Sequence, residues 1–368
     1  MRILHVITTI DRGGAENHLY ALVRGQKAAG HDVAVAFLKG SGEWGEGYRD
    51  LHVSVHDLGM RRYGDLRPLP RLRKLVKGAD VVHAHLPPAE FYARLALLGM
   101  PQRARMVISK HNDNPFYGGP LSGWLARWVA KRADSVIAIS DAVNRYMQGA
   151  GLPAGKLKTV HYGMSPVPPP SIAEVERLRA QWGVGERELL FVTVARLVPQ
   201  KALHVLVEAY RRYRAMSVVP SRLCIVGDGP LRDALMSQVR ESGLDPHVVL
   251  AGRRADIPVV MRAQDVFVLS SVHEGFGLVL LEAMDAARPI IATRVSAIPE
   301  VVEDGVSGTL VTSDDPDAFA AAMLAMEDSR LRARFGEAGR AGLLERFPVE
   351  RMVSQTLAVY SEALRSGA

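Results

Sequence analysis

Residues 266–293 read VFVLSSVHEGFGLVLLEAMDAARPIIAT, and this stretch decides the class of fold. An apolar run at 266–269 leads into a polar loop with two glycines, then into an apolar helix expected at 277–287 and a second apolar run at 289–292. Short apolar runs that alternate with helices are typical of parallel βαβ units, whose strands are covered by helices on both faces. The stretch therefore predicts an α/β protein with a parallel sheet.

The same alternation continues through both halves of the chain. Four prolines between Ser165 and Ser171 separate the halves, because such a sequence continues neither a helix nor a central strand. We therefore expect Rossmann-like, doubly wound domains at 1–165 and 166–348, facing across a cleft, and an amphipathic helix within 349–368. Strands are expected at 2–7, 32–37, 81–84, 105–108, 135–139, 189–195, 222–226, 248–250, 266–269, 289–292 and 309–311.

The composition excludes several classes of protein. Of the 368 residues, 48% are apolar and one, Cys224, is a cysteine, which excludes an internal disulfide or a cysteine-based metal site and fits a reducing cytoplasm. No apolar run in the sequence reaches the ~18 residues that span a bilayer. We expect a cytoplasmic enzyme with about two domains.

The net charge of +7 is concentrated in the first half. Residues 1–165 carry 23 Lys and Arg against 13 Asp and Glu, whereas the remainder carries 23 against 26. The segment from Arg61 to Lys77 holds seven basic residues and one acid, which favours peripheral contact with an anionic membrane surface, at ~1 kcal/mol per charge, over a nucleic acid partner. A second stripe is read equally well as a solvated helix face; it comprises Trp124, Arg127, Trp128, Lys131 and Arg132.

Three loops that follow predicted strands carry groups able to hold an anion. Residues 11–16, DRGGAE, open a helix whose N–H groups suit an anion, although an ordinary glycine-rich turn is the alternative. Arg196 and Lys201 follow the strand at 189–195 and suit a diphosphate. Glu282 lies about one and a half turns into the helix after the third loop, where it can accept hydrogen bonds from a ribose diol, and Glu274 lies at that loop's tip. Together the loops predict a nucleoside diphosphate site.

With these residues in place, the chain resembles the retaining GT-B glycosyltransferases of family 4, the glycosyl transferases group 1. Glu274 and Glu282 have the E-x7-E spacing of that family, within the sequence SSVHEGFGL. Further matches follow in the same order along nearly the whole chain: residues 13–16, 80–85, His111, 138–140, Arg196 with Lys201, 226–230, 299–300, 304–305 and Gly308. The set is specific for the family, whereas any single member is not.

The resemblance implies a role for individual residues. Gly14 approaches the donor diphosphate through its backbone, Glu282 holds the ribose, and His111 lies at the donor sugar. The C-terminal helix returns to the first domain, which takes the acceptor. The implied catalytic residues are Arg196, Lys201, Glu274 and His111; the implied donor-binding residues are Gly14, Gly227, Glu274, Gly275, Phe276, Gly277, Leu278 and Glu282; and His85 and Tyr162 are implied on the acceptor side.

The resemblance also implies the reaction. A hexosyl unit would pass, with retention of configuration, from a nucleotide-diphosphate sugar to a glycan, glycolipid or lipid-linked acceptor. A UDP-sugar is favoured, with GDP-mannose as the alternative, and neither a cofactor nor a metal is expected. Front-face attack and a covalent route both stay open. Two other classes are a catalytically silent subunit that binds a sugar nucleotide and a Rossmann oxidoreductase, which the missing G-x-G-x-x-G opposes.

Some residues depart from the family pattern, and others resemble metal-binding motifs. Ala195 and Ala202 stand where the family often has glycine, changes small enough to keep the phosphate loop, and Tyr162 stands where asparagine is usual. The sequence Asp-Pro-Asp at 315–317 looks like a D-x-D metal motif, but it begins an amphipathic helix, where acids cap the N-terminus. His83 and His85 alternate along a strand without a third ligand at suitable spacing, so no zinc site is expected.

Overall fold

The computed structural model describes residues 1–11, 13–100, 104–112 and 120–366, so Arg12 of the first glycine loop lies outside the described residues. The chain divides into two compact units. The first comprises Met1–Met164 with Phe347–Ala368, and the second comprises Ser165–Arg346.

The first unit contains a parallel sheet in the strand order β3-β2-β1-β4-β5-β6-β7. The central strands are apolar because helices cover both faces, and every residue of β4 is buried. The strands are β1 (Arg2–Ile7), β2 (Asp32–Phe37), β3 (Ser54–Asp57), β4 (Val81–His85), β5 (Arg105–Lys110), β6 (Ser135–Ala138) and β7 (Leu157–Thr159).

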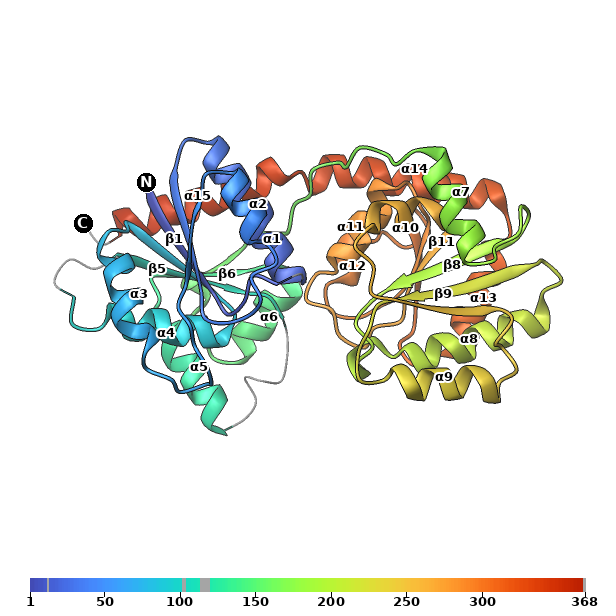
Figure 1. Cartoon of the computed structure of the whole chain (residues 1–368), viewed down its shortest axis with the longest axis horizontal. Helices are drawn as coiled ribbons and strands as arrows, with labels where there is room; N and C mark the ends of the chain where they lie inside the picture. Colours follow the sequence, from blue (N-terminus) through green and yellow to red (C-terminus); the bar gives the residue numbers. More distant parts are fainter. Residues whose placement is uncertain (12, 101–103, 113–119, 367–368) are drawn as a thin grey trace. The chain divides into compact units, whose positions relative to one another are not determined.

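Helices from both ends of the chain cover this sheet. On one face, α1 (Gly14–Ala28) packs beside α15 (Val349–Arg365), which buries residues at helical spacing such as Met352, Thr356 and Tyr360 (Figure 1). The close approach requires Gly25, where an added Cβ would lie 2.4 Å from Cγ2 of Val353. The remaining helices of the unit are α2 (Gly45–Asp50), α3 (Pro68–Lys77), α4 (Pro87–Leu97), α5 (Pro120–Arg132) and α6 (Asp141–Gly149).

The second unit contains a parallel sheet in the order β10-β9-β8-β11-β12-β13. Successive residues of β8 face opposite sides: Phe191 packs in the cluster under α8, and Leu190 packs in the cluster on the other face. The strands are β8 (Leu189–Val194), β9 (Ser221–Val226), β10 (Val248–Gly252), β11 (Val266–Leu269), β12 (Ile290–Thr293) and β13 (Gly308–Val311).

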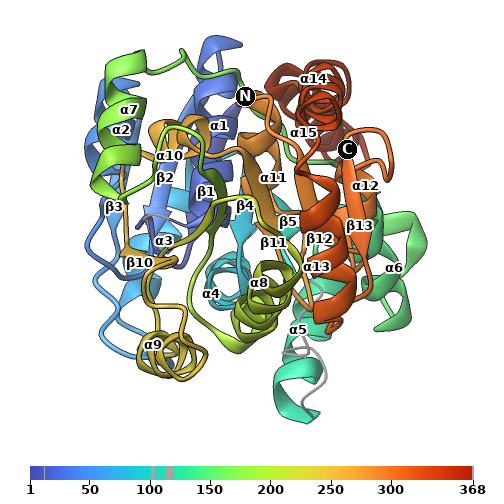
Figure 2. The ribbon, with the colours of Figure 1, turned by 90° about the vertical axis from the view of Figure 1, so that its right-hand side faces the viewer.

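The helices of the second unit form a layer on each face of its sheet. Within one layer α13 lies beside α8 (Figure 2). The opposite layer contains α7 and α10, which pack against each other. The helices are α7 (Ile172–Gln181), α8 (Leu203–Met216), α9 (Arg232–Glu241), α10 (Ile257–Ala263), α11 (Leu278–Asp285), α12 (Ile298–Val301), α13 (Pro316–Ala325) and α14 (Ser329–Arg346), with a 3₁₀ turn η3 (Pro199–Lys201) after β8.

Both strand orders are those of doubly wound Rossmann folds, so the predicted α/β class with two Rossmann-like domains is confirmed. The order reverses between β1 and β4 in the first sheet and between β8 and β11 in the second. At such a switch point the loops after the two strands diverge and leave room for a ligand beyond their carboxyl ends. The loops after β4, β8 and β11 are therefore the first places to look for function.

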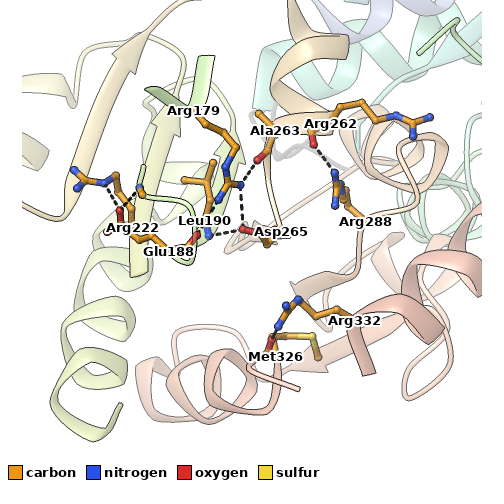
Figure 3. Close-up of polar contacts among 11 residues, drawn as sticks. Arg179, Glu188, Leu190, Arg222, Arg262, Ala263, Asp265, Arg288, Met326 and Arg332 are labelled. Carbon is orange, nitrogen blue, oxygen red and sulfur yellow. Dashed lines mark hydrogen bonds and ion pairs between the residues drawn. The ribbon is translucent and has the colours of Figure 1, made fainter. Parts of the chain in front are cut away.

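The amino edge of the second sheet is held by arginines (Figure 3). The Arg179 guanidinium donates to Ala263 O at 2.7 Å and to Asp265 Oδ2 at 3.1 Å, and Asp265 also accepts from the backbone N–H of Leu190 at 2.8 Å. These contacts tie α7 to the strands at the edge opposite to the switch-point loops. The candidate site residues lie at the opposite, carboxyl edge.

Candidate functional site

Two loops at the carboxyl edge of the second sheet are joined by backbone and side-chain hydrogen bonds. One follows β8 and the other follows β11, the two strands at the switch point. Ser270 Oγ donates to Lys201 O at 2.8 Å, Val272 N–H donates to Gln200 O at 2.9 Å, and Gln200 Nε2 donates to His273 O at 2.8 Å. The loops therefore form one preorganised surface rather than two independent turns.

Lys201 and Glu274 form an ion pair on this surface. Lys201 Nζ donates to Glu274 Oε2 at 2.5 Å, and the side chains are only 16% and 13% exposed. Ser271 Oγ donates to the same carboxylate oxygen at 3.3 Å. Arg196 lies on the same loop as Lys201 with its side chain exposed. The structure thus joins Lys201 to Glu274, and Arg196 adds a second cation on the same loop as Lys201; cations of this kind can hold a diphosphate.

Glycines shape the two loops. Gly227 follows β9 with φ +139°, and an added Cβ would lie 1.8 Å from Ala195 O, so Gly227 lets the loops after β8 and β9 pack closely. Gly277 has φ +85° and is the N-cap of α11. Gly275 and the Phe276 side chain are buried, and Leu278 begins the helix, whose N-cap residue Gly277 offers no side chain to cap the first N–H groups.

Glu282 lies in α11 and is half-buried. Burial raises the pKa of the Glu282 carboxyl to about 7, because a charge in a poorly solvated place is disfavoured. Hydrogen-bond donors from a ligand would reverse this effect by stabilising the carboxylate. Glu282 is therefore suited to accept hydrogen bonds from a diol that arrives with the ligand.

Backbone strain occurs at two loops that follow the predicted site strands. Ala202, directly after Lys201, has φ +44°, and Leu86, directly after His85, has φ +72°. Residues other than glycine rarely adopt such values, and strain of this kind concentrates at functional sites. The Ala202 conformation also explains why glycine suits this position better.

The carboxyl edge of the first sheet gathers a group of aromatic rings. His85 ends β4, His111 follows β5, and Tyr162 follows β7. His85 Nδ1 lies 3.1 Å from His111 Nε2, and His111 Nδ1 lies 2.5 Å from the Tyr162 hydroxyl. His18 of α1 stacks on Tyr162 with 4.1 Å between ring centroids. The structure therefore joins three predicted residues and adds His18, which sequence reasoning missed.

A third histidine joins the two predicted on β4. His5 comes from the neighbouring strand β1, and ring nitrogens of His5, His83 and His85 lie within 4.8 Å of one another. All three rings are buried, and their nitrogens are engaged in hydrogen bonds to other side chains. Because His5 is 78 residues before His83 in the sequence, spacing along one strand could not reveal it.

The glycine loop after β1 opens α1. Gly13 is the N-cap, and an added Cβ there would lie 2.4 Å from Oε2 of Glu16. Gly14 is the first residue of the helix, and an added Cβ would meet no described heavy atom within 4 Å. The Glu16 carboxylate would therefore have to shift to admit a side chain at Gly13, whereas the space at Gly14 is open. At the other end of the chain, Asp315 caps α13 by accepting from Ala318 N–H at 2.9 Å, as expected for a helix start.

The basic segment Arg61–Lys77 is mostly exposed, and the residues of it that are buried are Pro68, Leu72 and Val76. All seven cations are exposed, whereas Leu72 and Val76 of α3 are buried, so these apolar side chains are unavailable to a membrane. Tyr63 and Leu66 are 63% and 60% exposed. Tyr63 also lines an apolar hollow of about 260 Å³ together with Pro87, Phe91 and Leu125. In the described part of the chain no helix is long and apolar enough to cross a bilayer.

Comparison with known proteins matches both units. Residues 174–342 match the model of the glycosyl transferases group 1, and residues 12–166 match that of glycosyltransferase family 4. The chain is 30% identical over 363 residues to a GDP-mannose-dependent α-(1-6)-phosphatidylinositol monomannoside mannosyltransferase of Mycolicibacterium smegmatis, covering 91% of both proteins.

The chain belongs to this glycosyltransferase family. It is also 28% identical over 290 residues to an N-acetyl-α-D-glucosaminyl L-malate synthase of Bacillus anthracis, covering 78% of this chain and 75% of the synthase. The crystal structure of Anabaena Alr3699/HepE with UDP-glucose matches with a TM-score of 0.88 and 25% identity over the full length of both chains. The fold of this glycosyltransferase is therefore GT-B, as expected.

Proposed function

We propose that this glycosyltransferase moves a hexosyl unit from a nucleotide-diphosphate sugar, with retention of configuration and without a metal ion. The Lys201–Glu274 pair at the switch point of the second sheet is the observation that supports this best. It holds a cation at the carboxyl edge, where nucleotides bind in such sheets. Breaking the bond between the sugar and the phosphate creates an anionic leaving group, which preorganised cations stabilise.

Each candidate site residue of the second unit has a separate role in this proposal. Lys201 and Arg196 neutralise the leaving diphosphate, and the N–H groups at the start of α11 bind its oxygens. Glu282 accepts hydrogen bonds from the ribose. Glu274 contacts the donor sugar and shares Lys201 with the diphosphate. These two cations supply the charge stabilisation for which other transferases use a divalent metal.

A UDP-hexose is the favoured donor, and GDP-mannose is the alternative. The structure of Anabaena Alr3699/HepE contains UDP-glucose, whereas the mycobacterial relative depends on GDP-mannose. A panel of nucleotide sugars, each scored by the rise in melting temperature, separates these donors, because a ligand at 100 times its dissociation constant adds about 2.7 kcal/mol. If neither UDP-sugars nor GDP-sugars raise the melting temperature, the proposed donor class is refuted.

Product analysis tests the stereochemistry and the metal requirement. The anomeric coupling in the proton NMR spectrum of the first-formed product reports whether configuration is retained. Turnover should continue in the presence of EDTA. An inverted product or full loss of turnover on chelation, restored by a divalent metal, would contradict these parts of the proposal.

An anionic amphiphile, such as a lipid-linked glycan, is the proposed acceptor. The apolar hollow includes Pro87 and Pro88, the first two residues of α4, which begins two residues after His85 at the carboxyl edge of the first sheet. Its lining residue Tyr63 follows Arg61 and Arg62, both exposed, and carries Lys39 Nζ at 4.2 Å over its ring. An apolar cavity with a cationic rim fits a hydrocarbon chain with an anionic headgroup.

Vesicle flotation tests this acceptor class. At physiological salt, the protein should float with vesicles that contain phosphatidylglycerol and not with pure phosphatidylcholine. The double variant Arg61→Glu/Arg62→Glu should lose flotation, while Arg211→Glu/Arg212→Glu on α8 should keep it. Equal binding to both vesicle types, or full activity on a water-soluble acceptor alone, would contradict a membrane-borne acceptor.

The alternative is a catalytically silent subunit that binds a sugar nucleotide. It would show the rise in melting temperature without transfer or hydrolysis of the donor. The presence of Arg196, Lys201, Glu274 and Glu282 together favours the active enzyme.

A further inference from the structure

A continuous series of hydrogen bonds links α15 to His111 through the interior of the first unit. Tyr360 of α15 is fully buried, and its hydroxyl lies 3.3 Å from Gln26 Nε2 of α1. Gln26 Oε1 lies 2.8 Å from His5 Nε2, and His5 Nδ1 lies 3.0 Å from His85 Nε2. The series continues from His85 to His111 and Tyr162 through the contacts described above. We call these side chains the histidine relay: Tyr360, Gln26, His5, His85, His111 and Tyr162.

The histidines of the relay are neutral at physiological pH. Burial lowers the pKa of His5 to about 4 and that of His111 to about 3. Burial, together with the neighbouring rings, holds the pKa of His85 well below its usual range. A neutral imidazole has one N–H donor and one bare nitrogen acceptor. Each ring in the relay must therefore donate on one side and accept on the other.

The orientation of the Gln26 amide sets the direction of every bond in the relay. Its oxygen faces His5, so His5 Nε2 carries the proton and Nδ1 is bare. His85 must then donate from Nε2 to His5, and His111 must donate from Nε2 to His85. His111 Nδ1 is consequently bare and accepts from the Tyr162 hydroxyl. Every bond then has one donor and one acceptor.

The other side of Gln26 is also fully bonded in this orientation. Its nitrogen donates to the Tyr360 hydroxyl, which donates in turn to His83 Nδ1 at 2.6 Å, and His83 Nε2 donates to Ser109 Oγ at 2.7 Å. A single ring that changed its tautomer would leave two protons or two lone pairs facing each other. Such a mismatch is unfavourable, because a buried polar group without a partner has lost its hydrogen bonds to water and gained none. The relay can therefore reverse only as a whole.

We infer that Gln26 and Tyr360 are positioning residues, which fix His111 as the tautomer protonated on Nε2. Resting on the proposed function, this makes His111 Nδ1 a hydrogen-bond acceptor at the substrate edge of the first unit. A substrate hydroxyl that replaces Tyr162 there must bind as a donor. Gln26 and Tyr360 act through other side chains and touch neither sugar.

Nitrogen NMR of the full chain labelled with ¹⁵N-histidine tests the relay directly. The two-bond couplings between ring protons and nitrogens identify the protonated nitrogen of each ring, and we expect Nε2 for His5, His85 and His111 at pH 7. Gln26→Leu removes the acceptor for His5, so His111 should become a mixture of tautomers. An even mixture halves the competent population, which weakens the apparent substrate affinity about twofold.

A conservative variant and a matched control separate this effect from general destabilisation. Tyr360→Phe removes one hydroxyl, frees the Gln26 amide to rotate, and should give the same tautomer mixture even where Gln26→Leu fails to fold. Thr356→Val, one turn earlier on α15, changes a buried hydroxyl that bonds only to Met352 O among the described residues, and should leave the tautomers unchanged.

Three results would overturn the inference. They are a wild-type His111 protonated on Nδ1, an unchanged tautomer pattern in folded Tyr360→Phe, and stoichiometric Zn²⁺ binding that shifts the His5, His83 and His85 signals together. The last would make these nitrogens metal ligands. If the protein binds no donor but shows the expected tautomers, the proposed function is wrong and the relay stands. If the enzyme is active but lacks these tautomers, the relay is wrong and the proposed function stands.

Discussion

The ammonium group of Lys201 donates to Oε2 of Glu274 at 2.5 Å, although the two residues are 73 positions apart. Each comes from the loop after a strand at the switch point, so the parallel sheet itself brings them together. The pair keeps the cation in place before a ligand arrives. In the proposed function, the diphosphate of the donor competes with Glu274 for the same ammonium group.

Lys201→Ala should reduce transfer about 10²–10³-fold, because loss of one preorganised electrostatic contact to the departing charge has this effect. Arg211→Ala removes an exposed cation on α8 that pairs with Glu208 at 2.8 Å, and it serves as the control with unchanged activity. Steady-state kinetics and circular dichroism measure the activity and the fold. Near-normal activity in both Lys201→Ala and Glu282→Ala would refute the site.

Gly14→Ala should weaken donor binding at least tenfold without loss of stability. The added methyl group meets no described atom, and alanine at the start of α1 gains up to about 1 kcal/mol in helix propensity. Calorimetry of the donor and thermal unfolding check both expectations. Gly45→Ala is the matched control, since Gly45 also begins a helix and has the same open space. Equal donor affinity in the two variants would exclude a ligand at Gly14.

Donor affinity should rise with pH through the Glu282 pKa of about 7, since the carboxylate accepts from the ribose better than the acid does. Glu282→Gln should bind more weakly and without this pH dependence. Titration calorimetry between about pH 6 and pH 8 measures the effect. The exposed Glu345→Gln on α14 should retain the wild-type profile, and a wild-type affinity independent of pH would contradict this role.

The same group affects stability in the opposite direction. Its pKa in the folded state lies above the usual value of 4.5, so the folded state retains a proton that the unfolded state releases. The stability present below about pH 4.5 is therefore lost as pH rises through about 7. Glu282→Gln, which stays neutral, should become more stable than wild type as pH rises, by up to about 3 kcal/mol. Urea unfolding at several pH values measures this difference.

Acid should destabilise the first unit steeply. Burial lowers the pKa of five histidines in this unit, so below pH 6.5 their rings bind protons in the unfolded state but stay unprotonated in the folded state. The five are His5, His18, His83, His85 and His111. Stability is thus lost as pH falls below 6.5, on the order of 2 kcal/mol for each ring at pH 5. The slope of the unfolding free energy against pH should correspond to several protons. His5→Gln should reduce that proton number by about one, whereas the exposed His204→Gln should not, and a slope of one proton or less in wild type would contradict the prediction.

The strands of the second unit could be predicted from sequence because each is an apolar run between helices. Two edge strands of the first unit, β3 and β7, were not predicted. The β3 sequence is SVHD and the β7 sequence is LKT, and strands this short and polar lack a clear alternation. Edge strands need fewer apolar residues, because only one neighbour pairs with them.

The site residues could be predicted individually, but their contacts could not. Loop position and the family resemblance predicted Lys201 and Glu274, and the resemblance alone predicted His111. Gln26 and Tyr360 carry no motif and meet only after the chain has folded. Ala202 shows the same limit. Its small side chain was expected to fit the loop, but its φ of +44° could not be predicted without knowing the fold. Local sequence specifies residue types and strand ends, and tertiary packing specifies the hydrogen bonds.

The assignment of α15 to the first unit has a consequence for biosynthesis. The ribosome makes residues 165–346 before it makes α15. The second unit can therefore fold while the surface of α1 that contacts Val353 and Tyr360 is still uncovered. The nascent first unit exposes apolar surface throughout that interval, and Gln26 lacks its hydrogen bond to Tyr360. A chaperone that binds exposed apolar segments should therefore associate with the first unit during synthesis and leave once the last helix emerges.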